Sequence, residues 1–278
     1  MRIAKLGWIP YHNSAGAWWR GVRIRQATVI AEGEAWYVSF SVEQMVAEPA
    51  TPTGPPIGID LGIAQDATTA DAAGRHQVHL LPVARPEERR RLAILQRRIS
   101  RKKCRSRNQV RAQRRLHRYR RRITNRIRNA QHHLTTNWAQ NHRQVVIEDL
   151  RVQNMSASAA GTIAMPGRNV RQKAGLNRAI LERGWYELRL QLAYKCAWYG
   201  SQLVVVPAQH TSQRCSACGH TEAANRPSQA VFCCRACGHA GNADVNAARN
   251  ILGAGLALSA CGATQGGDEA GTCLKGVA

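Results

Sequence analysis

Short apolar runs and long periodic stripes alternate along this chain. The runs are rich in β-branched and aromatic residues, which suit a pleated surface, and they predict strands. Stripes in which apolar residues recur every three or four positions predict helices instead. The predicted strands are two runs within 1–48, joined by a turn at 32–34, and the segments 57–63, 66–70, 75–81, 144–150 and 203–206. The three segments that follow residue 56 are expected to form a β-meander.

The periodic stripes predict four helices. Within residues 85–138, a stripe on either side of the stretch 100–113 predicts two antiparallel helices joined by a basic connector. A further stripe predicts one helix over 177–199, which Gly200 ends. A short helix is expected over about 244–252.

The segments between these elements differ in composition. The Pro-rich linker 49–56 is expected to be stiff, because proline fixes φ and has no backbone N–H to donate. Residues 151–175 are polar and are expected to be loose, and the Gly- and Ala-rich tail 254–278 is expected to be flexible. The longest apolar run, 251–263, has about thirteen residues, fewer than the roughly 20 that a membrane span needs. The N-terminus lacks the apolar core of a signal peptide.

A formal net charge of +23 constrains the partners of the chain more than its fold. Half of the 40 basic residues lie between Arg85 and Arg128, where 18 Arg and two Lys accompany only two Glu. A merely solvated helix face is the weaker alternative, because solvated helices usually mix both signs. We expect a groove for a nucleic-acid backbone, and an anionic membrane is the second, weaker candidate partner. The candidate contacts are Arg97, Arg98, Arg101, Lys102, Lys103, Arg105, Arg107, Arg111, Arg114, Arg115, Arg118, Arg121 and Arg122.

Nine cysteines in a chain without an export signal point to a reducing compartment, and the cytoplasm is the expected location. Cys215-x2-Cys218 is followed after 15 residues by Cys234-x2-Cys237, with a glycine after each pair. This spacing predicts a structural zinc site, because two residues between ligands let a tight turn aim both sulfurs at one ion. Cys233 competes with Cys234 as the third ligand, and the symmetric spacing favours Cys234. A site of four thiolates is closed, so the zinc is expected to stabilise the fold rather than to catalyse.

Three acidic residues stand out by their context. Asp60 lies inside an apolar strand, Glu148 ends another, and Asp244 opens a helix just after the cysteine module. Each has a structural explanation of its own, namely a strand end at a turn, a solvated strand end and a helix N-cap. Together they can converge on one edge of a sheet, where carboxylate oxygens suit Mg²⁺. Two such ions support phosphodiester cleavage, so a magnesium site formed by these acids is a candidate catalytic centre.

Four segments of the chain occur in a characteristic order: IGIDLGIAQDATTADAAG, VVIEDLRVQNM, GLNRAILERGWYELRLQLAYKCAWYGSQLVVVPAQHTSQRCSACGH and GNADVNAARNIL. In these segments the chain resembles the TnpB family, transposon-encoded relatives of type V CRISPR effectors. The resemblance covers nearly everything from about residue 1 to 253. It implies that Asp60, Glu148 and Asp244 are the three RuvC acids, and that the paired cysteines belong to a zinc ribbon.

The resemblance also implies an α/β architecture. An RNase H-like (RuvC) nuclease domain would span 57–210 and carry the basic helical insertion 85–138. The zinc ribbon, 211–240, would precede the last RuvC segment, 241–253. Residues 1–48 would form part of a β-barrel.

The function implied by the resemblance is RNA-guided, Mg²⁺-dependent cleavage of a DNA target by a protein of a transposable element. Guide RNA and target DNA are the expected partners. Family members usually begin further upstream, so this chain is expected to be shortened at its N-terminus. The alternative is a non-catalytic or remnant nucleic-acid-binding protein, which would still use the basic helices.

Overall fold

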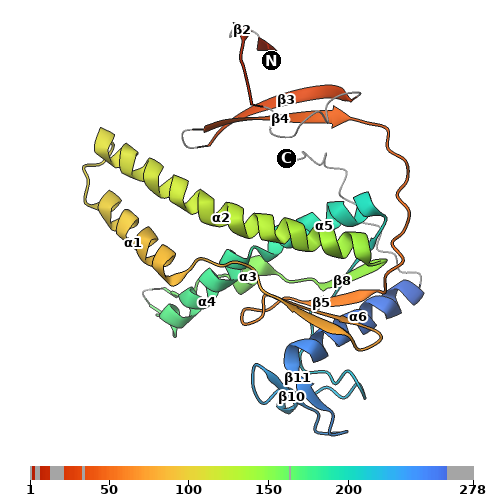
Figure 1. The fold of residues 1–278 in the computed structure, drawn as a ribbon. Coiled ribbons are helices and arrows are strands. Elements are labelled where there is room, and N and C mark those ends of the chain that lie inside the picture. The colour runs from red at the N-terminus through yellow and green to blue at the C-terminus, as the bar shows by residue number, and fades with distance from the viewer. Residues whose placement is uncertain (1, 4–6, 13–21, 33–34, 163, 262–278) are drawn as a thin grey trace. The chain divides into compact units, whose positions relative to one another are not determined.

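The computed structural model describes residues 2–3, 7–12, 22–32, 35–162 and 164–261 (Figure 1). The chain divides into two compact units. Unit 1 contains residues 1–48, 92–120 and 265–278, and unit 2 contains residues 49–91 and 121–264.

Unit 1 contains two short antiparallel sheets. Strand β1 (Arg2–Ile3) pairs with β2 (Gly7–Trp8), and β3 (Arg23–Glu32) pairs with β4 (Ala35–Glu43). The second pair confirms the hairpin predicted from the two runs within 1–48. That these strands belong to a β-barrel stays a prediction.

Unit 2 is built on a five-stranded sheet in the order β7-β6-β5-β8-β9. Its strands are β5 (Ile57–Asp60), β6 (Ala67–Asp71), β7 (His76–His79), β8 (Gln144–Glu148) and β9 (Gln202–Val206). The first three form the predicted antiparallel meander, whereas β5, β8 and β9 run parallel to one another. The parallel strands are nearly continuous apolar runs because both faces of this part of the sheet are covered.

The two faces of the sheet carry different cores, since successive strand side chains point to opposite sides. Ile59 and Ile147 pack on one face with Trp138 and Leu188, which come from helices α2 (Arg107–Asn141) and α5 (Trp185–Tyr199). On the other face, Val146 packs against helix α6 (Ala243–Ala260). Figure 1 shows α5 and α6 on opposite sides of the sheet.

The remaining helices are α1 (Pro86–Ser100), α3 (Val152–Met155) and α4 (Val170–Arg183). The basic region forms two helices, as predicted, with a connector of residues 101–106 that is shorter than expected. The expectation of one helix over 177–199 is wrong. Gly184 adopts a left-handed conformation, with φ of +58°, and separates α4 from α5. Helix α4 also begins at Val170, inside the stretch that was expected to be loose.

Helix α6 continues to Ala260, eight residues beyond its expected end at 252, so the flexible tail does not begin at 254. The helix continues because its later turns pack on the sheet. A Cβ atom on Gly255 would lie 2.5 Å from the side chain of Val146, so only glycine permits this approach. Residues 262–278 of the expected tail lie outside the described residues. Within the described part of the chain, no helix is both long and apolar enough to cross a membrane.

Two glycines of α6 separate the effect of close packing from that of helix propensity. Gly255→Ala is expected to destabilise the protein by about 1–3 kcal/mol, because the added methyl group overpacks against Val146. A Cβ atom on Gly253 would meet no described neighbour of the helix within 4 Å, so Gly253→Ala should stabilise the helix by about 0.5–1 kcal/mol. Urea unfolding of both variants measures the difference. Equal effects of the two substitutions would contradict the packing of α6 on β8.

Candidate functional site

Two of the three predicted acids lie at the carboxyl ends of neighbouring parallel strands. Asp60 is the last residue of β5 and Glu148 is the last residue of β8. Ile59 pairs with Ile147 in the register of these strands, so the following positions stand side by side. Adjacent strands are about 4.8 Å apart, which puts the two acidic residues next to one another at one edge of the sheet.

The third acid, Asp244, reaches this edge on the first turn of α6. Helix α6 packs closely on β5 because Gly58 has no side chain. A Cβ atom there would lie 2.2 Å from the carbonyl oxygen of Ala248, which is one helical turn after Asp244. The N-cap of α6 is Asn242, whose side chain accepts hydrogen bonds from the backbone N–H groups of Asp244 and Val245 at 2.9 and 3.1 Å. Asn242 therefore fills the N-cap role that the position of Asp244 suggested, and the carboxylate of Asp244 does not cap the helix.

The electrostatics of Asp60 indicate that the three acids form one cluster. Burial, followed by the charges of Glu148 and Asp244, raises the pKa of Asp60 to about 8, while the charge of Arg226 opposes the shift. Burial also raises the pKa of Glu148 and of Asp244. The cluster is loose, because the carboxylate oxygens of the three residues do not all lie within 4.8 Å of one another.

Two residues that the sequence did not single out contact these acids. Thr211 donates a hydrogen bond from its hydroxyl group to Oε1 of Glu148. Arg226 lies with Nη2 3.3 Å from Oδ1 of Asp244, and it also donates to the carbonyl oxygen of Gln229 at 2.8 Å. The only signal for either residue was its place in the segment that holds the cysteine pairs, which does not distinguish it from its neighbours.

The four predicted cysteines come together in the ribbon that contains β10 (Val231–Cys233) and β11 (Ala240–Asn242). Their sulfur atoms all lie within 4.8 Å of one another, with 3.7 Å between Cys215 and Cys237 and 3.6 Å between Cys218 and Cys234. A tetrahedral zinc ion with Zn–S distances of about 2.3 Å would separate its sulfurs by about 3.8 Å. The donor set and its spacing therefore fit zinc.

Each cysteine pair lies on a turn of the same design. The N–H group of Cys215 donates to the carbonyl oxygen of His220, and that of Cys234 donates to His239, at 2.9 and 2.8 Å. The glycines after the pairs, Gly219 and Gly238, have φ of +78° and +72°, which few other residues adopt at low cost. Cys234 belongs to the sulfur cluster, whereas Cys233 lies on β10 outside it. The cysteine that the symmetric spacing favours is thus the one that joins the sulfur cluster, and its role as a zinc ligand stays a prediction.

The predicted nucleic-acid contacts lie on the last turn of α1, the connector and α2. All of them are exposed except Lys102 and Arg121, which are half-buried. The apolar stripe of the same region is buried at Leu95, Leu116 and Ile123, so the helices direct their basic residues toward solvent. This arrangement is typical of a surface that binds a polyanion through phosphate contacts.

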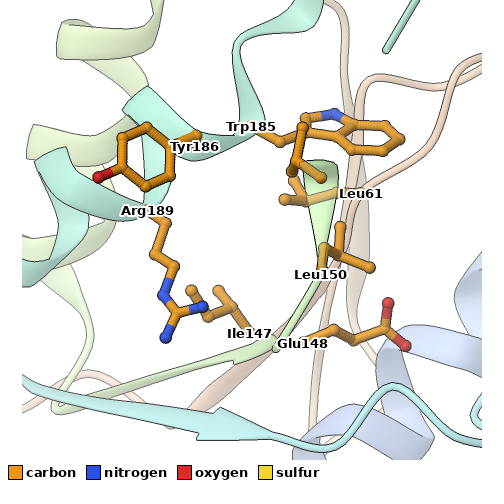
Figure 2. Close-up of a pocket in the computed structure, with 8 residues that line it drawn as sticks. Leu61, Ile147, Glu148, Leu150, Trp185, Tyr186 and Arg189 are labelled. Carbon is orange, nitrogen blue, oxygen red and sulfur yellow. The ribbon is translucent and has the colours of Figure 1, made fainter. Parts of the chain in front are cut away.

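A small hollow lies beside Glu148 at the end of β8. Figure 2 shows Tyr186 and Arg189 of α5 on one side of it and Leu61 and Leu150 on the other. Arg189 forms an ion pair with Asp149, the residue that follows Glu148. The surroundings of the acid cluster on the α5 side are thus mainly aromatic and aliphatic.

Two protein-family models match the chain. The model described as "Probable transposase" (OrfB_IS605) matches residues 39–159, and "Cas12f1-like, TNB domain" matches residues 185–251. The chain is 46% identical over 260 residues to "Putative RNA-guided DNA endonuclease InsQ" of Escherichia coli, and the match covers 94% of this chain and 63% of InsQ. A relative from Streptomyces pristinaespiralis is 39% identical over 228 residues, which cover 82% of this chain and 52% of the relative.

The chain therefore spans between about half and two thirds of the length of these relatives. Among solved structures, a CRISPR-Cas12f ternary complex matches with a TM-score of 0.50 at 19% identity, over 83% of this chain and 44% of that one. This likeness shows a shared mixed α/β fold. The motifs, the two family models and the relatives agree, and the chain is similar to the TnpB family over most of its length.

Proposed function

We propose that this chain contains the nuclease centre of an RNA-guided DNA endonuclease of a transposable element, and that it hydrolyses phosphodiester bonds with the help of divalent metal ions. The observation that carries the proposal is the cluster of Asp60, Glu148 and Asp244 at the carboxyl edge of the sheet. Carboxylates with raised pKa values at one site, without an equal number of cations, are typical of a site that binds a metal ion.

The three acids would hold two Mg²⁺ ions, because a pair of ions suits phosphodiester hydrolysis. When bound, such ions supply an activated water and stabilise the charge of the leaving oxygen. The side chains of this chain have separate tasks around them. Thr211 orients Glu148 through its hydroxyl group. Arg226, which already neutralises part of the charge on Asp244, is placed to attract a substrate phosphate to the acid cluster.

The other parts of the chain fit the same function. The basic helices would bind the backbone of the guide–target duplex, so that base pairing reads the sequence while the protein reads shape and phosphate. The four cysteines would hold a structural zinc ion, which stabilises the ribbon. Relatives of this chain are named as RNA-guided or CRISPR-associated DNA endonucleases, which supports guide RNA and target DNA as its partners.

Cleavage of labelled single-stranded DNA tests the nuclease centre. With Mg²⁺, and with and without copurified RNA, Asp60→Ala should reduce the rate by roughly 10²-fold or more, since the metal ions that stabilise developing charge would lose a ligand. The control is Glu187→Ala, which removes a surface ion pair with Arg128 and a long hydrogen bond from Gln191, both at 3.5 Å. Equal cutting by Asp60→Ala and the unsubstituted protein would exclude Asp60 from the reaction. No cutting by either protein would favour the alternative, a non-catalytic nucleic-acid-binding protein.

The salt dependence of duplex binding tests the basic helices. Joint replacement of Arg107, Arg111, Arg115 and Arg122 by Gln should reduce the magnitude of the slope of log K against log salt by up to about 3 to 4. Each lost phosphate contact lowers the magnitude of this slope by about 0.9. The matched control replaces four exposed arginines elsewhere, Arg151, Arg168, Arg171 and Arg178. Both sets change the net charge equally. A similar loss of slope in the two proteins would mean that total charge, and not this surface, determines binding.

Substitution of single cysteines tests the zinc site. Cys215→Ser should lower the bound zinc, measured by atomic emission, and should lower the melting temperature, because the ribbon loses a ligand. Cys233→Ser should leave both unchanged, since its sulfur lies outside the cluster. Retention of zinc by Cys215→Ser, or loss of zinc from Cys233→Ser, would overturn the assignment of ligands.

A further inference from the structure

A buried ion pair holds the loop that follows Asp60. This loop, residues 61–66, joins β5 to β6, and its last residue is Asp66. Arg183, the last residue of α4, lies with Nε 2.7 Å from Oδ1 of Asp66, and the two side chains are only 10% and 6% exposed. Neither of these two atoms has a hydrogen-bond partner among the described residues, so the contact between them is electrostatic.

The other polar atoms of the pair bind backbone groups. Nη2 of Arg183 donates to the carbonyl oxygen of Ile63, in the middle of the loop. Nη1 donates to the carbonyl oxygen of Ala179 at 2.9 Å, which fixes the side chain against its own helix. Oδ2 of Asp66 accepts a hydrogen bond from the N–H group of Leu81 at 2.7 Å. Arg183 thus holds the loop at two points, Ile63 and Asp66.

The backbone of Arg183 is fixed as well. Gln131 of α2 donates from Nε2 to the carbonyl oxygens of Arg183 and Gly184, at 2.6 and 3.3 Å. Gln131 is itself buried, at 2% exposure. These bonds fix the backbone of Arg183 at the junction of α4 and α5. The guanidinium group is fixed separately by its contacts with Ala179 and the loop.

Stability alone is a weak reason for such a pair. Well-packed apolar residues in place of a buried ion pair are often neutral or stabilising, because both charges must be desolvated. The planar fork of arginine, in contrast, presents several N–H groups at fixed and separate positions, whereas lysine offers a single nitrogen on a flexible stem. The charges that shift the pKa of Asp60 are those of Glu148, Asp244 and Arg226. Arg183 contacts the loop at Ile63 and Asp66, so an effect of Arg183 on Asp60 would pass through the backbone of the loop.

We propose that Arg183 and Asp66 are positioning residues, which set the carboxylate of Asp60 for binding of a divalent metal ion. The inference rests on the proposed function, because it assumes that Asp60 is a metal ligand. Replacement of an outer-shell residue that orients a metal ligand typically changes the metal affinity by 10- to 100-fold. Replacement of Arg183 should therefore weaken metal binding while the zinc ribbon and the basic helices stay intact.

The test is a calorimetric titration of the full chain with Mn²⁺, accompanied by thermal melting. Arg183→Lys keeps the charge but loses the fork, and it should lower Mn²⁺ affinity at least about tenfold. A second variant joins Arg183→Met with Asp66→Asn, which removes both charges and keeps an acceptor for the N–H group of Leu81. This double variant should fold, and it should bind Mn²⁺ as weakly as Arg183→Lys does. The control is Arg89→Gln, which breaks the ion pair with Glu182, the residue beside Arg183, without touching the loop.

The outcomes separate this inference from the proposed function. If Asp60→Ala binds Mn²⁺ as tightly as the unsubstituted protein, the proposed metal site itself is wrong. If Asp60→Ala loses Mn²⁺ but both folded Arg183 variants bind it with unchanged affinity, only the positioning role is wrong. A loss of affinity in Arg89→Gln equal to that in Arg183→Lys would also overturn it, because any disturbance of α4 would then suffice. Loss confined to the Arg183 variants supports the inference.

Discussion

The cost of burying three carboxyl groups at one edge of the sheet is the constraint on which the centre of unit 2 depends. Asp60, Glu148 and Asp244 lie at the rim of a sheet whose interior is apolar on both faces. Burial and its two acidic neighbours raise the pKa of Asp60 from 3.8 to about 8. Between these pH values the folded chain keeps a proton that the unfolded chain has lost, so this group makes the metal-free fold less stable as pH rises. The packing of the sheet and α6 must offset that cost, and a divalent cation in place of the proton would reduce it.

Much of this arrangement could be predicted from the sequence, for reasons that differ from one element to the next. Strands β5, β8 and β9 were predictable because each lies in a short, mainly apolar run. The ribbon was predictable because its four cysteines lie in two pairs, and the geometry of each pair is fixed by the two residues between its cysteines. The convergence of the acids is harder to predict from sequence patterns, since Asp60 and Asp244 are distant in sequence. They come to the same edge of the sheet only through the packing of α6 on Gly58.

Other features could not be predicted because they depend on contacts that leave no pattern. The apolar stripe continues on both sides of Gly184, so the pattern predicts one helix across the break that this glycine marks at the end of α4. The side chain of Gln131, from another helix, binds the carbonyl oxygens at this break. Gly255 suggests a helix end by composition, yet in the fold it is the residue that lets α6 approach Val146. Arg226 and Thr211 have ordinary sequence neighbours, and only the folded ribbon brings them to the acids.

The ribbon therefore has a second role beside its own stability, because its attachment to α6 decides where Arg226 and Thr211 lie. Asn246 of α6 accepts from the N–H group of Ser216 at 2.9 Å and donates to the carbonyl oxygen of Arg214 at 2.8 Å. One turn later, Asn250 donates to the carbonyl oxygens of Thr211 and Arg214. These bonds tie the first cysteine turn to the same helix that carries Asp244. Unfolding of the ribbon would displace the residues that contact two of the three acids, so the cysteine cluster and the acid cluster are mechanically linked through α6.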